Sequence, residues 1–340
     1  MKINSVRELA KILGLSHTTV SDALRGSERV KESTRKKVIK AAKDYGYQYN
    51  PLAGALMSQM RRGSADTFRG VIAVVDLEGA KQRPEVFARY HQEVKEGAAL
   101  AAKKVGFKTE SFALGSEGIS VDRLNSILLS RGISGILILP AGANPDLSVL
   151  DWSHFSGVYT DYIIEHPAID SVCSNHFRSM FLVMNKLKSL GYQRPGLVMH
   201  KAHDERLLHR WEAAFRIYHE YYPYFSKTEP LILNEYDENT FLEWFHKETP
   251  DVVLCHRNRV LKWMIASGVK VPETHGFCCL NVKMSVDPVA GLDLQPRIIG
   301  ERGMELLVSL IYSNKTGIPE MPSNTTIPSA WVDGPTLRKM

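Results

Sequence analysis

Residues 5–25 read SVRELAKILGLSHTTVSDALR. Two signals that start helices lie in this stretch: Ser5 and Glu8 have the spacing of a capping box, and Ser16 can cap a second helix. Apolar side chains recur at helical spacing after each cap, and Gly14 lies between the two helices. Two short helices that cross steeply at a tight turn are typical of a helix-turn-helix unit. The stretch therefore predicts such a unit near the N-terminus.

A third helix is expected over residues 33–45, which would complete a small all-α domain over residues 1–49. The second helix of a helix-turn-helix enters the DNA major groove, and its first residues contact base edges. The candidate DNA contacts are the polar residues of this helix and the basic residues after it: Ser16, His17, Thr18, Ser21, Asp22, Arg25 and Arg29. The alternative is a generic three-helix bundle that uses these residues only for solubility.

The charge of the chain supports DNA binding. The 340 residues carry a formal net charge of +6, with 24% charged, 44% hydrophobic and 9% aromatic residues, which is an ordinary globular composition. Residues 1–64 hold thirteen Lys and Arg but five Asp and Glu, so this segment is +8 and the rest of the chain is −2. A basic segment on a slightly acidic body indicates a polyanion-binding domain, rather than a merely solvated tail, because the segment is patterned to fold.

A short hinge helix and linker are expected over residues 50–68. Asn50 is a good N-cap, and the proline after it suits the first helical position. The residues that follow are mostly apolar and include Ala53 and Leu56, and so short a helix needs a partner. That partner is either the minor groove, into which an apolar side chain would wedge, or the body of the protein.

From residue 69 onward, strands and helices alternate. Strands are expected at residues 70–75, 107–114, 135–139, 157–160, 195–199, 230–233, 252–255 and 276–280, and helices at 88–105, 122–131, 177–190, 207–221, 240–247 and 260–267. Uninterrupted apolar runs such as Gly135–Leu139 suit parallel sheets that are covered on both faces. The pattern restarts once, which predicts two α/β units in series, and ligands of open α/β sheets bind beyond the carboxyl ends of the strands.

Residues 8–56, ELAKILGLSHTTVSDALRGSERVKESTRKKVIKAAKDYGYQYNPLAGAL, resemble the DNA-binding headpiece and hinge of the lactose-repressor/galactose-repressor family of bacterial transcription regulators. They carry the elements Ala-x-x-x-Gly-[Val/Leu]-Ser-x-x-Thr-Val-Ser, Thr-Arg-x-x-Val and Gly-Tyr-x-x-Asn. The resemblance implies that His17 and Thr18 read bases and that Leu56 wedges into the minor groove. Asp22 departs from the arginine that the family often has, which implies an unusual operator half-site or an ion pair with Arg25.

The resemblance extends to the body. It implies a periplasmic-binding-protein-like α/β core over residues 69–340, which binds an effector and forms dimers. The first lobe would hold about residues 69–160 and 291–323, and the second lobe about residues 161–290. Residues 297–312 would return to the first lobe.

The cleft residues match the family only in part. The candidate effector contacts are Asp161, Arg210, Trp211, His256, Arg257 and Asn281. Arg210 matches the family's cleft arginine with a one-residue uncertainty in register. His256 and Arg257 stand where the family has Asn and Asp. Because arginine prefers planar oxyanions, the pattern favours an acidic or phosphorylated sugar, or a diverged cleft, over a neutral sugar. Alternatively, Arg257 pairs with an acid on the surface.

The sequence as a whole predicts a DNA-binding transcription regulator, a repressor of carbohydrate-metabolism genes that binds a near-palindromic operator as a homodimer and is switched by a small ligand. A ligand-independent or activating regulator with a diverged cleft is the alternative. A solute-binding protein would lack the headpiece, and catalytic motifs of the phosphate-loop or nucleophile-elbow kind are missing, so an enzyme is not expected.

No metal or cofactor is expected, because His200, His203 and His209 have no standard ligand spacing. The adjacent Cys278 and Cys279 are expected to be buried rather than redox-active. Without a signal sequence or a long apolar run, the protein is expected to be cytoplasmic and free of membrane contact.

Overall fold

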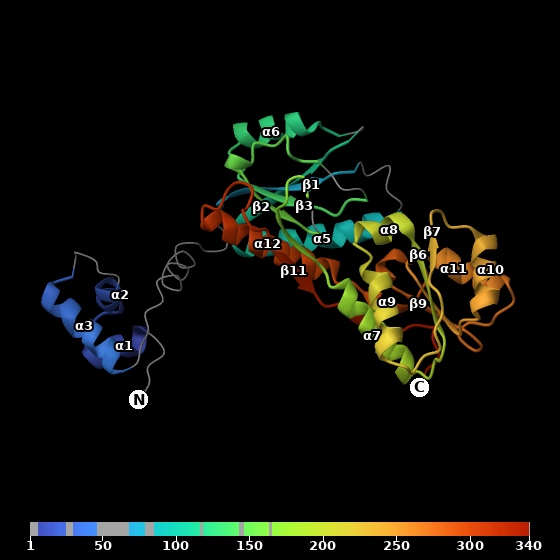
Figure 1. Cartoon of the computed structure of the whole chain (residues 1–340). Coiled ribbons are helices and arrows are strands. Elements are labelled where there is room, and N and C mark those ends of the chain that lie inside the picture. Colours follow the sequence, from blue (N-terminus) through green and yellow to red (C-terminus); the bar gives the residue numbers. More distant parts are fainter. Residues whose placement is uncertain are drawn as a thin grey trace. The chain divides into compact units, whose positions relative to one another are not determined.

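The computed structural model describes residues 6–24, 30–45, 68–78, 85–115, 118–142, 146–162 and 165–339. The chain divides into two compact units, Met1–Thr67 and Phe68–Met340 (Figure 1). None of the helices in the described ranges has the length and apolar character needed to cross a bilayer.

The first unit contains the predicted helix-turn-helix. Its helices are α1 (Val6–Leu13), α2 (His17–Leu24) and α3 (Glu32–Asp44). Ser16 caps α2 as predicted, because its Oγ accepts a hydrogen bond from the Thr19 backbone N–H at 3.1 Å. Gly14 has φ +64°, which a side chain would strain, and so supplies the turn between α1 and α2. A small core is shared by all three helices and consists of Leu9, Ala10, Val20, Ala23, Val38, Ala41 and Ala42.

The second unit consists of two lobes, each built on a six-stranded sheet. The first-lobe sheet has the order β11-β5-β4-β3-β1-β2, with strands β1 (Gly70–Asp76), β2 (Phe107–Ala113), β3 (Gly135–Ile138), β4 (Ser156–Tyr159), β5 (Asp170–Ser174) and β11 (Asn324–Ile327). The second-lobe sheet has the order β12-β10-β9-β8-β6-β7, with strands β6 (Pro195–His200), β7 (Leu231–Leu233), β8 (Val252–Cys255), β9 (Gly276–Cys279), β10 (Ala290–Asp293) and β12 (Ala330–Val332). The described pairs are parallel except that of β10 with β12.

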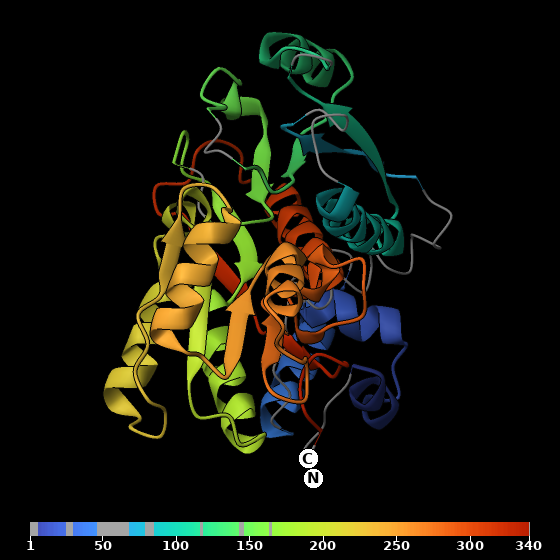
Figure 2. The ribbon, with the colours of Figure 1, turned by 90° about the vertical axis from the view of Figure 1, so that its right-hand side faces the viewer.

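Helices cover both faces of each sheet. The first lobe has α5 (Glu85–Lys104), α6 (Val121–Ser130) and α12 (Pro296–Tyr312), and the second has α7 (His176–Ser189), α8 (Lys201–Arg206), α9 (Arg210–Tyr221), α10 (Glu238–Glu248) and α11 (Asn258–Ala266). The helix α12 returns to the first lobe as expected and lies beside α5 (Figures 1 and 2). Glycines allow the two helices to approach closely, because any side chain there would clash with the backbone of the other helix. A Cβ atom at Gly97 would lie 1.9 Å from the Arg297 carbonyl oxygen, and one at Gly300 would lie 2.0 Å from the Val94 carbonyl oxygen.

The chain crosses between the lobes at different positions from those expected. Residues 161–290 were assigned to the second lobe, but β5 within them pairs with β4 and β11 of the first-lobe sheet. Residues 291–323 were assigned to the first lobe, but β10 belongs to the second-lobe sheet. The strands β1–β5 and β11 form the first-lobe sheet, and β6–β10 and β12 form the second-lobe sheet. The chain therefore crosses between the lobes after β5, after β10 and after β11.

The three crossing segments are hydrogen-bonded to one another. The Ser174 hydroxyl donates to the Leu294 carbonyl oxygen at 2.8 Å, and the Asn175 backbone N–H donates to the Ile327 carbonyl oxygen at 2.9 Å. The hydroxyls of Ser179 and Ser329 lie 2.6 Å apart. This bonded group of crossings connects the two lobes and lies at the edge of the cleft between them.

Candidate functional site: recognition helix and inter-lobe cleft

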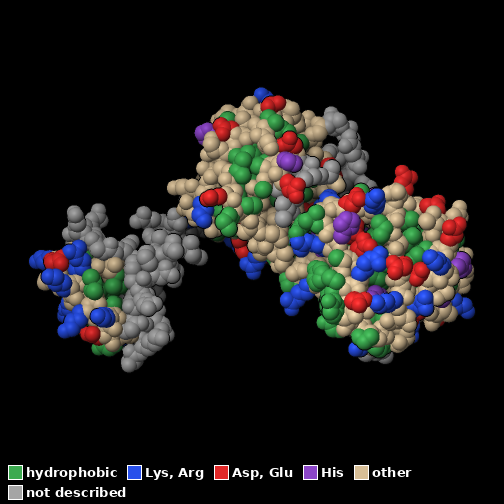
Figure 3. Space-filling view, in the orientation of Figure 1, with side chains coloured by type: hydrophobic (Ala, Val, Ile, Leu, Met, Phe, Trp, Pro, Cys, Tyr) green, Lys and Arg blue, Asp and Glu red, His purple; other side chains and the backbone are tan. Residues whose placement is uncertain are grey.

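The helix α2 has one apolar face and one polar face. Val20 and Ala23 are buried in the headpiece core, whereas Thr18 is exposed and Ser21 and Asp22 are half-buried. The helix α2 therefore has a buried apolar face and a polar face that is not part of the headpiece core. Lys and Arg side chains occupy much of the face of this unit shown in Figure 3.

Only part of the predicted DNA-contact set falls within the described residues. Ser16 is exposed, and its hydroxyl is engaged by Thr19 in the cap. The side chain of His17 lies outside the described residues, as do Arg25, Arg29, Asn50, Ala53 and Leu56. The roles assigned to these residues remain predictions.

A cavity of about 360 Å³ lies between the two lobes. Its first-lobe wall consists of Glu78, Tyr90, His91, Pro140, Ala141, Gly142 and Asp161. Its second-lobe wall consists of His176, His200, Ala202, His203, Arg206, Leu207, Tyr236, His256, Arg257, Asn281, Met284 and Leu294. Most of these residues follow the carboxyl ends of parallel strands, the position at which open α/β sheets bind ligands.

An ion pair joins the two walls of the cavity. Asp161, just after β4 of the first lobe, pairs through Oδ2 with Nη1 of Arg206 on α8 of the second lobe. The other carboxylate oxygen of Asp161 accepts the Tyr162 backbone N–H at 2.8 Å. Burial acts to lower the pKa of Arg206, but the charge of Asp161, its hydrogen bond and the nearby tyrosines together raise the pKa above its usual value. The pair is largely shielded from solvent, because only 12% of the Asp161 side chain and 20% of the Arg206 side chain are exposed.

Three imidazoles of the second-lobe wall are held neutral by burial. Burial lowers the pKa of His176 to about 4 and that of His256 to about 3, and it lowers the pKa of His203 well below the usual value. The rings of His203 and His256 are 4.8 Å apart between centroids, and Trp211 contacts His176 at 5.2 Å and His256 at 5.3 Å. A neutral imidazole presents one donor and one acceptor, so this wall suits hydroxyl groups better than anions.

Polar atoms at the back of this wall have no hydrogen-bond partner within the described residues. They are Nδ1 of His176, Nε2 of His256 and Nε1 of Trp211. Buried polar groups are normally paired, so a water or a polar ligand group that reached these atoms would remove an energetic cost.

Four of the six predicted effector contacts line the cavity: Asp161, His256, Arg257 and Asn281. The other two do not. The guanidinium of Arg210 lies over the Tyr162 ring at 3.9 Å from its centroid, and Trp211 is fully buried behind the wall. Both residues lie in the first turn of α9, which begins at Arg210, and their roles as effector contacts remain predictions.

Three residues that were not predicted from the sequence also line the cavity: His176, Arg206 and Tyr236. His176 follows β5, whose sequence DSVCS has too few apolar residues to be predicted as a buried strand. Arg206 lies on the six-residue helix α8, directly before the single helix that was expected from residue 207. The polar residues that follow each strand, including Tyr236 after β7, were the available signal. The predicted burial of Cys278 and Cys279 is confirmed, and burial raises the pKa of the Cys279 thiol to about 12.

Comparison with known proteins matches both parts of the chain. Residues 5–50 match the family described as "Bacterial regulatory proteins, lacI family". The HTH-type transcriptional regulator CelR of Thermobifida fusca is 29% identical over 132 residues, which is 38% of this chain and 35% of that protein. The probable HTH-type transcriptional repressor ExuR of Bacillus subtilis is 40% identical over 55 residues, 16% of each protein. The chain thus spans about a third or less of the length of these relatives.

Solved structures share the fold over nearly the whole chain. A transcriptional regulator CelR–cellobiose complex is 18% identical, covers 98% of this chain and 99% of its own, and has a TM-score of 0.59. A lac repressor dimer bound to operator and an anti-inducer is 15% identical, covers 99% of each chain and has a TM-score of 0.54. Residues 5–50 therefore match the headpiece of the lacI family of bacterial regulatory proteins, and the whole chain shares the fold of these solved regulators.

Proposed function

We propose that this protein is a sequence-specific transcription regulator that binds a near-palindromic operator as a homodimer and changes its DNA affinity when a small ligand occupies the inter-lobe cavity. The observation that carries the proposal is the presence, in one chain, of a helix-turn-helix and of a cavity at the strand ends between two lobes. The first binds DNA, and the second provides a site whose occupation can alter the geometry of the lobes.

The DNA-binding half of the proposal rests on α2. Its buried residues fix the helix in the headpiece core, so that Thr18, Ser21 and Asp22 are presented from a rigid element. Contacts from such residues to base edges give sequence specificity, while cations of the unit contact phosphates and give salt-dependent affinity.

The ligand we propose is a sugar or a sugar derivative. Neutral imidazoles and the Asn281 amide offer donors and acceptors, and the CelR structure that shares the fold is a cellobiose complex. The expectation of an acidic sugar depended on a positive charge from His256 and Arg257. His256 is neutral, and the cavity's two arginines face two carboxylates, Glu78 and Asp161, so the lining offers an anion no excess of positive charge. We therefore place neutral sugars first, with sugar acids and sugar phosphates as the competing ligands.

Selection of bound sequences from random duplex DNA, at one stated salt concentration, tests the regulator function. We expect a site of two inverted half-sites. The selected duplex is then titrated with the protein in the presence of cellobiose, other neutral sugars, sugar acids and sugar phosphates. A change in DNA affinity of about 5- to 150-fold with one of these classes is the usual size of allosteric coupling.

Matched variants separate the two halves of the function. Thr18→Ala should relax the selected sequence at one position of each half-site, whereas Lys40→Ala, which removes an exposed cation of α3, should leave the selected sequence unchanged. His256→Ala should abolish the ligand effect without altering DNA affinity. Weak, sequence-independent binding under every ligand condition would contradict the proposal, and specific binding that no ligand alters would leave a ligand-independent regulator.

A further inference from the structure

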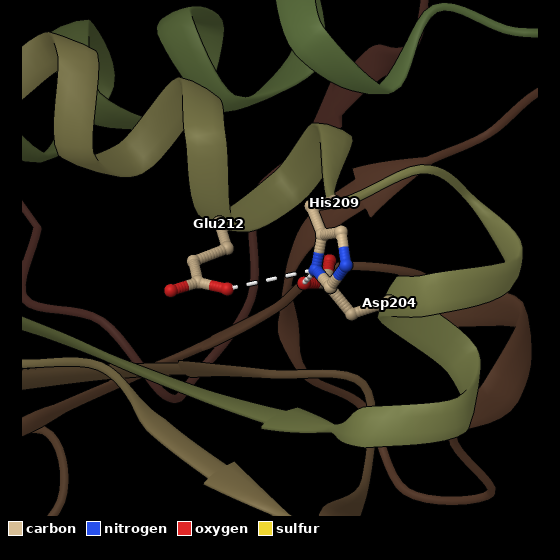
Figure 4. Close-up of side chains that lie close together, drawn as sticks. All are labelled: Asp204, His209 and Glu212. Carbon is tan, nitrogen blue, oxygen red and sulfur yellow. Dashed lines mark hydrogen bonds and ion pairs between the residues drawn. The ribbon is translucent and has the colours of Figure 1, made fainter.

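The turn that joins α8 to α9 brings three metal-capable side chains together, outside the cavity lining (Figure 4). Nδ1 of His209 lies 3.0 Å from Oδ2 of Asp204 and 3.7 Å from Oε2 of Glu212. All three candidate ligand atoms lie within 4.8 Å of one another, and the described residues contain this one group of that kind. In Figure 4 the Glu212 carboxylate points toward the side of the His209 ring at which the Asp204 carboxylate also lies.

The carboxylate of Asp204 is buried and only partly hydrogen-bonded. The residue is fully buried, and its Oδ1 atom has no hydrogen-bond partner among the described residues. Burial raises the pKa of this carboxyl, and the hydrogen bond with His209 only partly offsets that effect. A buried anion with an unpaired oxygen is costly unless a cation or a donor compensates it, and a second carboxylate lies nearby.

The other two side chains are arranged so that each presents one atom to Asp204. Glu212 is held from behind, because its Oε1 accepts a hydrogen bond from Nε of Arg216 at 2.8 Å, which leaves Oε2 directed at His209. A partner that orients a ligand in this way is typical of metal sites. The His209 side chain is 55% exposed, so an ion can reach the group from solvent.

We propose that Asp204, His209 and Glu212 bind a divalent transition-metal ion of the zinc type at the start of α9. One imidazole nitrogen and two carboxylate oxygens are a ligand set that Zn²⁺ accepts, with water in the fourth position. Ligand atoms of a tetrahedral zinc site are about 3.3 Å apart, given metal–ligand distances of about 2.0–2.1 Å. The observed separations of 3.0 and 3.7 Å lie on either side of that value. The ion would bring a positive charge to the buried carboxylate of Asp204.

The position of this metal site gives it a structural role. The helix α8 carries Asp204 together with His203 and Arg206, two residues of the cavity wall. An ion held by Asp204 of α8 and by Glu212 of α9 would fasten the two helices together. It would therefore restrict the movement of the cavity wall, whether or not the cavity binds a sugar.

The test uses the full chain without a histidine tag, treated with a chelator and then dialysed. Titration with ZnCl₂ in a calorimeter should show one ion bound per chain, and saturating Zn²⁺ should raise the melting temperature by several degrees, because an ion that binds only the folded state stabilises it. Asp204→Asn, which preserves shape, should weaken binding about 100-fold or more. His209→Gln alters an exposed side chain and tests the same site if Asp204→Asn fails to fold.

Matched controls lie close by. Glu205→Gln changes the neighbouring acid, which is half-exposed and 3.8 Å from Lys201, and His246→Gln removes an exposed histidine of α10. Both variants should bind Zn²⁺ as the unchanged protein does. The proposal is overturned if the unchanged protein shows no saturable binding, or if Asp204→Asn and His209→Gln bind Zn²⁺ as tightly as the two controls.

Discussion

The two walls of the cavity have the same architecture but opposite chemistry. Each is formed by residues at the carboxyl ends of parallel strands and by the helices that follow. The charged residues of the first-lobe wall are the carboxylates Glu78 and Asp161, whereas those of the second-lobe wall are Arg206 and Arg257, accompanied by four histidines. Opposite charges on facing walls attract, so the cleft contributes its own closing force through the Asp161–Arg206 pair.

This difference indicates how a ligand can act. A ligand that binds both walls must either preserve the ion pair or replace it, since each charge is largely buried and costly to leave alone. A ligand whose hydroxyl groups bond to the second-lobe imidazoles leaves the pair intact. The balance between ligand contacts and the ion pair would then set how far the lobes close.

Acid should destabilise the second-lobe wall more than any of the single substitutions proposed below. The folded protein keeps His176 and His256 neutral, with pKa values of about 4 and about 3, whereas the unfolded chain takes up protons near 6.5. Above pH 6.5 these histidines are mostly neutral in both states and do not affect the free energy of unfolding. As the pH falls below 6.5, protons bind preferentially to the unfolded chain, and the free energy of unfolding decreases. Well below pH 6.5 each group costs about 1.4 kcal/mol per pH unit, so the two groups together should cost about 3 kcal/mol between pH 6.5 and 5.

Urea unfolding at both pH values, followed by tryptophan fluorescence, measures this loss, because all five tryptophans lie in the second unit. The double variant His176→Gln/His256→Gln should show a much smaller loss, and His154→Gln, which changes an exposed histidine, should behave as the unchanged protein. An equal loss in the double variant would show that other groups dominate.

Breaking the ion pair from the second-lobe side should have the next largest effect. Arg206→Met leaves Asp161 charged, 12% exposed and unpaired, and should lower the free energy of unfolding by about 2–3 kcal/mol. Adding Asp161→Asn should restore most of that loss. Urea unfolding at pH 7 measures both changes.

Lys227→Met provides the control for this prediction. It breaks a surface pair with Glu220 in which both side chains are about two-thirds exposed, and pairs of that kind contribute little. If the Asp161→Asn/Arg206→Met protein is no more stable than Arg206→Met alone, the unpaired carboxylate is not the source of the loss.

The sequence could predict the elements that are specified locally and the general position of the cavity. The run Gly135–Leu139 indicated a buried strand by itself, and Ser16 indicated the start of α2, because in each case neighbouring residues suffice. The position of the cavity at the strand ends followed from the expected alternation of strands and helices.

The detailed composition of the walls could not be predicted, because it depends on contacts between distant parts of the chain. The Asp161–Arg206 pair joins residues 45 positions apart in two different lobes. The strand β5 is identified by its neighbours β4 and β11 rather than by its own apolar content. An error there moved the boundary between the lobes and left His176 out of the predicted site.

A second contact across the lobes lies at α5 and should contribute less. Lys283, in the short helix Val282–Met284 of the second lobe, pairs with Glu93 of α5 at 2.8 Å and lies 3.5 Å from Asp293. The three side chains are 21–28% exposed, so solvent screens them more than it screens the Asp161–Arg206 pair. Lys283→Met should cost about 1 kcal/mol in urea unfolding. Lys262→Met, at an exposed position of α11, should leave the free energy of unfolding almost unchanged. Equal losses in the two variants would argue against a stabilising role for the Lys283–Glu93 pair.

The smallest effect should come from Arg210, although it also extends from the second lobe toward the first. Its guanidinium lies over the Tyr162 ring rather than beside a carboxylate, and burial lowers its pKa, in contrast to that of Arg206. A cation–π contact at a partly exposed site contributes about 0.5–1 kcal/mol, so Arg210→Gln should lower the free energy of unfolding by about that amount. The same urea measurement compares it with Arg206→Met. Arg206 and Arg210 are four residues apart in sequence and contact consecutive residues, Asp161 and Tyr162. The ratio of the two losses in free energy of unfolding therefore measures how much more a carboxylate partner contributes than an aromatic one. Equal losses would mean that contacts between the lobes stabilise the protein whether or not they pair opposite charges. The opposite charges of the two walls would then not govern closure.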